Sequence, residues 1–264
     1  LIPLHHPEGL TSTAARLAYR WGIRRAVRRA DAVFVPSRAT ADDLHTSLGV
    51  ERDRLVVTPY AVDPRFEPAP TDAVVRARDR LGLPERYLLC LGTGKPHKNL
   101  ARLVEAWALL RPEAKDDYRL VVAGRPDPRF ADANDRCREL GLDDVHVLGE
   151  VPETLLPALY SGATAFVLPS LREGFGLPVL EAMACGVPVA CSSAASLDEV
   201  AGDGALLFDA NDAYAIAEAM TRLIADRACR RRLVELGQRR LQLFSWHRTA
   251  RLTVDAYRRF VEAG

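Results

Sequence analysis

The chain has 264 residues, of which 48% are hydrophobic and 27% are charged, and its formal net charge is +1. This length allows one large globular domain or two of moderate size. The near-neutral charge gives no support to general nucleic-acid binding, so we expect no nucleic-acid partner.

The sequence predicts neither a membrane span nor an export signal. No apolar stretch approaches the ~20 residues that cross a bilayer, and the first residues, LIPLHHPEGL, lack a basic region followed by an apolar core and a cleavage site. The five cysteines form no C-x-x-C pair, which is typical of buried thiols in a reducing compartment. We therefore expect a cytoplasmic protein.

Apolar runs rich in β-branched residues alternate along the chain with segments of helical period, which is the pattern of a parallel sheet wound with helices. The predicted strands are 32–35, 56–60, 87–91, 120–123, 145–148, 165–168, 187–191 and 205–208. The predicted helices are about 13–30, 38–48, 99–111, 130–140, 153–161, 177–185, 211–225, 227–241 and 246–262. Residues 63–70, DPRFEPAP, break this periodicity with three prolines and predict a linker. Only two strands precede it, too few for a complete doubly wound domain, whereas six follow.

The segment EGFGLPVLE, residues 173–181, follows a predicted strand directly. Its proline suits the first turn of a helix, and Gly174 and Gly176 allow the backbone to approach a ligand. Exposed N–H groups and the helix dipole at such a terminus favour an anion such as a phosphate. Glu173 lies before this helix and Glu181 lies on it, so the two carboxylates are expected to reach different parts of one ligand.

The loop after residue 91, GTGKPHKN, leads from a strand into a helix. Asn99 is a candidate N-cap for that helix, and Lys98 places a cation at the edge of the sheet where ligands of doubly wound folds bind. The loop matches neither G-x-G-x-x-G nor a Walker sequence, which disfavours a dinucleotide-dependent enzyme and a P-loop kinase.

Several separated motifs in this order resemble the retaining glycosyltransferases of family four in the GT-B class. EGFGLPVLEAMACGVPV is similar to their E-x7-E signature, and YLLCLGTGKPHKNLARLVEAW is similar to the opening of their carboxyl-terminal domain. The resemblance implies an α/β fold of two doubly wound Rossmann-like domains. We assign residues 1–65 to the end of a truncated first domain, 66–245 to the donor-binding domain, and 246–264 to a helix that crosses back to the first domain.

The resemblance also implies a role for each matched residue. Glu173 would lie against the transferred sugar, Glu181 would bind the ribose hydroxyls, and Lys98 would pair with the diphosphate. The backbone of residues 174–177 (Gly174, Phe175, Gly176, Leu177) would face the sugar and diphosphate, and the loops with Gly92, Thr93, Gly124, Arg125, Gly149 and Val151 would border the nucleotide. Many members carry arginine where this chain has Thr93, and Arg125 is the candidate replacement.

The implied reaction is transfer of a hexosyl group, a mannosyl group above all, from a nucleotide diphosphate sugar to a hydroxyl of a glycan or lipid-linked acceptor. A GDP-linked donor is favoured, and no metal and no further cofactor are expected. Members usually carry acceptor-side residues, including a catalytic histidine, before a stretch like LIPLHHPE. The chain as given is therefore expected to bind donor and to transfer poorly or not at all.

Three alternatives remain open. A glycoside hydrolase also uses two carboxylates but has no need of a phosphate site. A donor-binding pseudoenzyme or regulatory module would keep the binding residues and lose turnover. A sugar-nucleotide epimerase would be expected to carry a dinucleotide fingerprint.

The predicted helix at 13–30 has arginines at every fourth position, Arg16, Arg20, Arg24 and Arg28, opposite an apolar stripe. Such a basic face fits an anionic membrane surface, which would place the protein at the inner face of the membrane. A solvated arginine face on a helix packed by its other side is the favoured interpretation, because arginine is also a good helix former. The sequence leaves both interpretations open.

Overall fold

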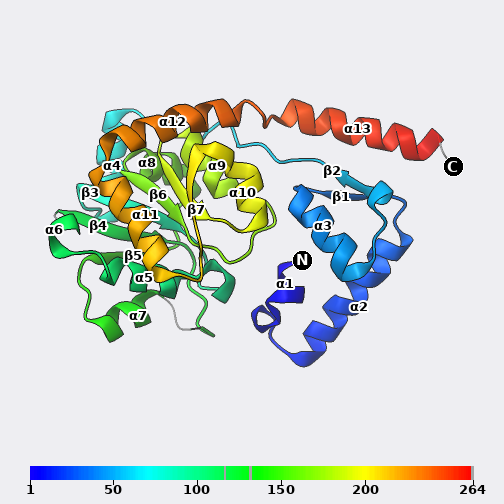
Figure 1. Cartoon of the computed structure of the whole chain (residues 1–264), viewed down its shortest axis with the longest axis horizontal. Coiled ribbons are helices and arrows are strands. Elements are labelled where there is room, and N and C mark those ends of the chain that lie inside the picture. The colour runs from blue at the N-terminus through cyan, green and yellow to red at the C-terminus, as the bar shows by residue number, and fades with distance from the viewer. Residues whose placement is uncertain (116, 131–132, 263–264) are drawn as a thin grey trace.

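The computed structural model describes residues 1–115, 117–130 and 133–262, which fold into two units (Figure 1). The strands are β1 (Val33–Val35), β2 (Leu55–Val57), β3 (Arg86–Leu91), β4 (Tyr118–Ala123), β5 (Val145–Gly149), β6 (Ala165–Leu168), β7 (Val189–Ser192) and β8 (Ala205–Phe208). The helices are α1 (Ile2–His5), α2 (Thr13–Arg29), α3 (Arg38–Leu48), α4 (Thr71–Leu81), α5 (Leu100–Ala108), α6 (Pro112–Lys115), α7 (Ala133–Leu140), α8 (Leu156–Ser161), α9 (Leu177–Ala184), α10 (Ala195–Ala201), α11 (Ala213–Ala225), α12 (Arg227–Leu241) and α13 (Trp246–Glu262).

The larger unit is built on a six-stranded sheet in the order β5-β4-β3-β6-β7-β8, in which every pair of neighbours is parallel. Because side chains alternate along a strand, Leu88 and Cys90 of β3 face one buried core and Tyr87 and Leu89 face another. A sheet buried on both faces explains the unbroken apolar run of this strand. The predicted α/β class with a parallel sheet is confirmed.

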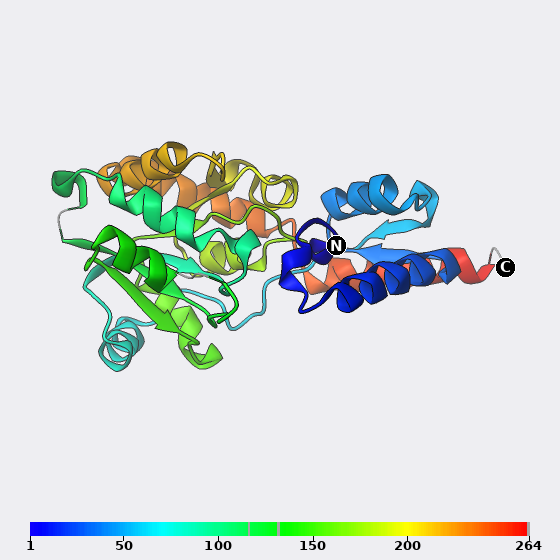
Figure 2. The same cartoon turned by 90° about the horizontal axis from the view of Figure 1, so that it is seen from below.

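The smaller unit, called here the N-terminal unit, comprises α1 to β2. Its two strands pair in parallel, and a separate apolar core joins Val27 of α2 to Val35 and Leu44. Both views place α13 beside this unit rather than beside the six-stranded sheet (Figures 1 and 2). Phe34 contacts Tyr257 of α13 with ring centroids 5.5 Å apart, and Thr249 donates a hydrogen bond to the carbonyl of Pro59. The chain therefore returns to the N-terminal unit at its end.

Each predicted strand is present, with small shifts at the ends. The strand expected at 56–60 ends at Val57, since Thr58 makes its last ladder bond to the carbonyl of Val35 and Pro59 has no N–H. The strand expected at 187–191 begins only at Val189, because the N–H of Val187 instead closes α9 by donating to Ala182.

The helix predictions need more correction. Four helices were missed: α1, α4, α6 and α10. Asn99 does stand at the N-cap position of α5, as predicted, but its φ of 59° is left-handed and its side chain makes no capping hydrogen bond. The Asn99 amide instead donates to the carbonyls of Pro169 and Ala210, at 3.1 and 2.7 Å, and so ties two loops together. Of the helix expected at 130–140, residues 131–132 lie outside the described residues.

Helix α2 packs against the N-terminal unit through a narrow stripe of residues. Its opposite face, which carries both arginines and apolar side chains, is exposed. Only Val27 of this helix is buried, whereas Arg20, Arg24 and Arg28 are exposed. Leu17 and Trp21, on the same face, are 63% and 66% exposed. In the part of the chain that the structure describes, no helix combines the length and the apolar character needed to cross a membrane.

Candidate functional site

The candidate site lies where the strand order changes direction. From β3 the chain builds outward through β4 and β5, then crosses over to β6 on the other side of β3. Strands β3 and β6 are hydrogen-bonded neighbours, and the connections that follow them lead in opposite directions along the sheet, to β4 and to β7. Ligands of open α/β sheets bind at this switch point. The two loops are those that carry Lys98 and Glu173.

Lys98 and Glu173 meet at this point as a largely buried ion pair. The Nζ atom of Lys98 lies 2.6 Å from Oε1 of Glu173, and their side chains are only 18% and 10% exposed. The Ser170 hydroxyl donates to the same carboxylate oxygen at 2.7 Å. A cation and a carboxylate are thus held together beside the start of α9, although they are 75 residues apart in sequence.

The neighbouring His97 contributes no positive charge to this loop. Its side chain is buried against His6 of the N-terminal unit, with ring centroids 5.7 Å apart. Burial, reinforced by the charge of Lys98, lowers the pKa of His97 to about 4, so that this imidazole is neutral at pH 7.

The glycine-containing loops after β3, β4 and β5 lie against one another. Gly92 donates its N–H to the carbonyl of Ala123 at 2.9 Å, and Gly124 donates to that of Gly149 at 2.7 Å. Gly124 has a φ of 142°, and a Cβ atom there would lie 2.1 Å from the carbonyl oxygen of Gly92. The close packing of two loops therefore requires this glycine, independently of any ligand.

A cavity of about 260 Å³ opens between these loops and the start of α9. Its lining includes predicted nucleotide-contacting residues together with the proline of α9: Gly92, Thr93, Lys98, Gly124, Val151 and Pro178. Gly149 instead lines an adjoining cavity of about 290 Å³ with Gly92 and Gly124. Arg125 is exposed and is not among the residues that line the first cavity.

The start of α9 is fixed by packing on the side away from the loops. Gly176 has a φ of 111°, and a Cβ atom there would lie 2.4 Å from Cδ2 of the fully buried Leu197. The Phe175 ring packs edge-on against Tyr60 and Phe244, with centroids 5.5 and 5.7 Å away. The side chain of Leu177 packs against the buried core. Only the backbone of these residues is thus free to face a ligand.

Glu181 lies on α9, where its Oε2 atom accepts a hydrogen bond of 2.7 Å from the Tyr160 hydroxyl. Burial raises the pKa of Glu181, and the hydrogen bond from Tyr160 only partly offsets that shift. The folded chain without ligand therefore carries a carboxylate whose charged form is disfavoured.

Because burial disfavours the charged form of Glu181, we expect the Glu181→Gln substitution to raise stability and to weaken nucleotide binding. A raised folded-state pKa favours folding below the ordinary pKa of a glutamate, and the advantage is lost as the pH rises through the raised value. At pH 7 the neutral amide avoids that loss, so we expect the variant to melt at a higher temperature than the wild type. Its nucleotide affinity should fall about tenfold, because the amide offers one acceptor oxygen instead of two.

Thermal melts from pH 4 to 8 check this prediction. The melting temperatures of the variant and the wild type should converge in acid, where Glu181 is protonated. A variant that is less stable than the wild type at pH 7 would show that the charged carboxylate is well solvated.

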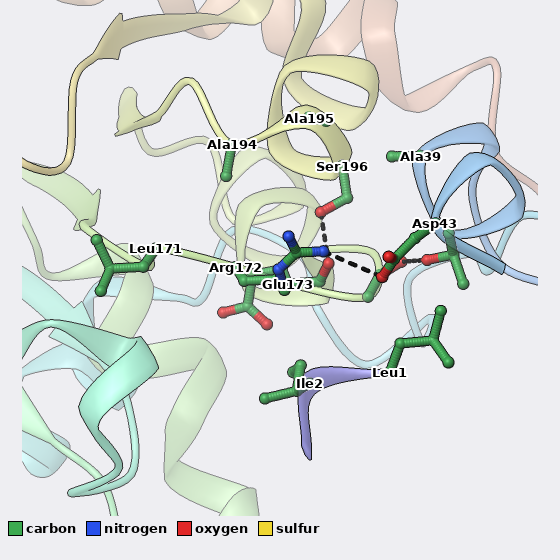
Figure 3. Close-up of a pocket in the computed structure, with 12 residues that line it drawn as sticks. Leu1, Ile2, Ala39, Asp43, Leu171, Arg172, Glu173, Ala194, Ala195 and Ser196 are labelled. Carbon is green, nitrogen blue, oxygen red and sulfur yellow. Dashed lines mark hydrogen bonds and ion pairs between the residues drawn. The ribbon is translucent and has the colours of Figure 1, made fainter. Parts of the chain in front are cut away.

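A second pocket, of about 130 Å³, joins the other side of the Glu173 loop to the N-terminal unit (Figure 3). Arg172 and Asp43 point toward each other across it, with Nη1 and Oδ2 3.0 Å apart. His5 of α1 lies 2.7 Å from the other oxygen of Asp43. The two units are therefore joined by an ion pair directly beside Glu173.

The sequence did not point to Ser170, Tyr160 or Asp43. Ser170 carries a weak signal, since it stands three residues before Glu173 in the same loop. Tyr160 and Asp43 carry no such signal, because their partners are distant in sequence. Tyr160 bonds Glu181, 21 positions away, and Asp43 bonds Arg172, 129 positions away.

Comparison with known protein families shows which family has this sequence pattern. Residues 75–240, more than half of the chain, match the family described as glycosyl transferases group 1. The chain belongs to this family. Residues 3–61 match a second description, the glycosyl transferase 4-like domain. Membership argues against the glycoside hydrolase and the epimerase alternatives, and it confirms the resemblance stated from the motifs.

Two relatives from Escherichia coli are named mannosyltransferases. The O-antigen chain mannosyltransferase B is 36% identical over 210 residues, which cover 78% of this chain and 55% of that protein. The serotype-specific mannosyltransferase WbdA is 32% identical over 268 residues, which cover all of this chain and 33% of that protein. The chain thus spans about half the length of one relative and a third of the other.

Solved structures show the same fold. Sucrose-phosphate synthase from Thermosynechococcus elongatus superposes with a TM-score of 0.76 at 30% identity, covering 97% of this chain and 65% of that one. HepE from Anabaena, solved in complex with UDP and glucose, superposes with a TM-score of 0.79 at 19% identity, covering 97% and 68%. These glycosyltransferases have the GT-B architecture, which this chain shares.

Proposed function

We propose that this family member binds a nucleotide diphosphate sugar at the β3–β6 switch point and transfers its hexosyl group, with retention of anomeric configuration, to a hydroxyl of a glycan or lipid-linked acceptor. The observation that carries the proposal is the buried pair of Lys98 and Glu173 beside the start of α9. The two mannosyltransferase relatives support a mannosyl group, and we favour a GDP-linked donor.

Each residue of the site has a distinct part in this proposal. The diphosphate lies at the N–H groups that begin α9, and Lys98 turns from Glu173 toward its phosphate oxygens as negative charge develops on the leaving group. Glu173, released from Lys98 in part, faces the positive charge that develops on the sugar. Glu181 accepts the ribose hydroxyls, and the loops after β3, β4 and β5 border the base.

A turnover experiment tests the proposal. The full-length protein is incubated with GDP-mannose, GDP-glucose or UDP-glucose and with methyl mannosides as acceptors, and released nucleotide and product anomer are measured by chromatography and NMR. Nucleotide release that depends on Glu173, with a product of the donor's configuration, supports it. Inverted product, or release unchanged by Glu173→Gln, contradicts it.

A donor-binding module without turnover is the second candidate. It is favoured by the exposed Thr93 at the cavity, where many relatives of this class carry arginine, and by the position of Arg125 outside the cavity lining. Tight donor binding by the full-length protein, with no nucleotide release in the presence of acceptor, would select this candidate.

We also propose that α2 holds the protein at the inner, cytoplasmic face of an anionic membrane. Its exposed Leu17 and Trp21 lie among Arg20, Arg24 and Arg28, a combination that suits the boundary between headgroups and acyl chains. Each arginine near an anionic surface contributes about 1 kcal/mol, so replacing the three by glutamine should weaken vesicle binding roughly 100-fold.

Co-sedimentation with phosphatidylglycerol-containing vesicles measures this effect. The matched control replaces Arg231, Arg232 and Arg239, which are equally exposed on α12, and should leave binding unchanged. If both triple variants lose vesicle binding equally, the binding depends on the net charge of the protein and α2 has no special role.

A further inference from the structure

The first turn of α3 is docked on the loop that carries Glu173. The hydroxyl of Thr40 donates a hydrogen bond of 2.9 Å to the carbonyl of Gly174. The Ser37 hydroxyl lies at the same distance from this carbonyl and accepts the N–H of Thr40 at 3.0 Å as the N-cap of α3. Two hydroxyls of the N-terminal unit thus converge on one carbonyl of the E-x7-E segment.

Side-chain hydroxyls hold the backbone of this loop at several points. Gly174 has no side chain, and a Cβ atom added there would meet nothing within 4 Å. The preceding carbonyl, that of Glu173, accepts the Ser196 hydroxyl at 2.8 Å. Two successive carbonyls are therefore held by hydroxyls from α3 and α10, and these bonds decide how the Glu173 peptide is oriented.

A separate contact keeps α3 in place. The carboxylate of Glu199 on α10 accepts the N–H groups of Arg38 and Ala39, both at 3.0 Å. An acidic group at the first turn of a helix satisfies free N–H groups and complements the helix dipole. Loss of the Thr40 hydroxyl alone should therefore leave α3 seated.

We propose that Thr40, assisted by Ser37, is a positioning residue for Glu173. By fixing the Gly174 carbonyl it sets the angle at which the Glu173 carboxylate meets the sugar of the bound donor. The inference rests on the proposed function, because it assumes that Glu173 faces the sugar. It adds that recognition of the sugar depends on the N-terminal unit, whereas the nucleotide is bound by the six-stranded unit alone.

The test compares a nucleotide with its sugar conjugate, since only the conjugate reaches Glu173. Calorimetric titrations with GDP and GDP-mannose, and with UDP and UDP-glucose, are run on the wild type, Thr40→Val and Thr40→Ser. For the pair that binds, Thr40→Val should weaken the sugar nucleotide about tenfold and the free nucleotide less than twofold. Thr40→Ser, which keeps the hydroxyl, should restore the wild-type ratio.

Two further variants separate positioning from stability. Glu173→Gln should lower the same ratio directly. Ser37→Ala removes the helix cap and should lower the melting temperature more than Thr40→Val does. It keeps the Thr40 bond and loses only the assisting hydroxyl, so it should lower the ratio less than Thr40→Val. Equal weakening of both ligands by Thr40→Val, or no weakening of either, overturns the inference while nucleotide binding stands. If the wild type binds none of the four compounds, the proposed function fails and the inference falls with it.

Discussion

Replacing Lys98 by methionine should weaken nucleoside diphosphate binding on the order of 30-fold, because one charge-assisted contact to the phosphates is lost. The same change should lower the free energy of unfolding by about 2–3 kcal/mol, since the largely buried Glu173 carboxylate keeps only the Ser170 hydroxyl as a partner. The loss of stability follows from the 2.6 Å contact between the two side chains, and the loss of affinity follows from the proposed contact of Lys98 with the phosphates.

Calorimetric titration and urea denaturation measure the two effects. Lys95→Met is the matched control, because Lys95 stands in the same loop but is exposed. It should change neither quantity appreciably. If Lys98→Met lowers stability but leaves nucleotide affinity intact, Lys98 serves only to hold Glu173 and has no contact with the phosphates.

Gly176→Ala should be the most destabilising single substitution in the E-x7-E segment. The new Cβ would overlap the terminal Cδ2 atom of Leu197, whose side chain is fully buried among its neighbours, and alanine is strained at a φ of 111°. Together these effects should cost roughly 3 kcal/mol or more. The start of α9 would shift, and nucleotide binding should be lost with it.

Gly174→Ala provides the control two residues away. No atom lies within 4 Å of the added Cβ, so its free energy of unfolding should stay within about 0.5 kcal/mol of the wild type. Urea denaturation measures the free energy of unfolding of both variants. Similar midpoints for the two would show that Leu197 repacks around the added methyl group.

The strands and the two loops that carry Lys98 and Glu173 were predictable because their sequence signals are local. Apolar runs of β-branched residues specify strands wherever they pair, and glycine, proline and a glutamate after a strand mark a helix start suited to phosphate. The order of strands in the sheet was not predictable, because periodicity shows that a strand exists and does not name its neighbour. The contact between Lys98 and Glu173 depends on that order, since it exists only because β3 and β6 are adjacent.

The missed elements have physical reasons of their own. Helix α4 has few strongly apolar residues and follows directly on a proline-rich stretch, so its first turn looked like more linker. Helix α10 has only seven residues, and small side chains give it little periodicity. Gly124 was assigned to ligand approach, although the packing of its loop against Gly92 already requires a glycine. The contacts of Thr40 and Asp43 join the N-terminal unit to the six-stranded unit. Sequence patterns predict elements within each unit but not contacts between the two.

The most direct test of the central claim is calorimetric titration of the chain with GDP, UDP, ADP and TDP, each with Mg²⁺ and with a chelator. We predict that one nucleotide binds equally well under both conditions, GDP being favoured, and that Lys98→Met and Glu181→Ala each weaken it. Failure of all four to bind, or binding that survives both substitutions, would contradict a donor site at the β3–β6 switch point.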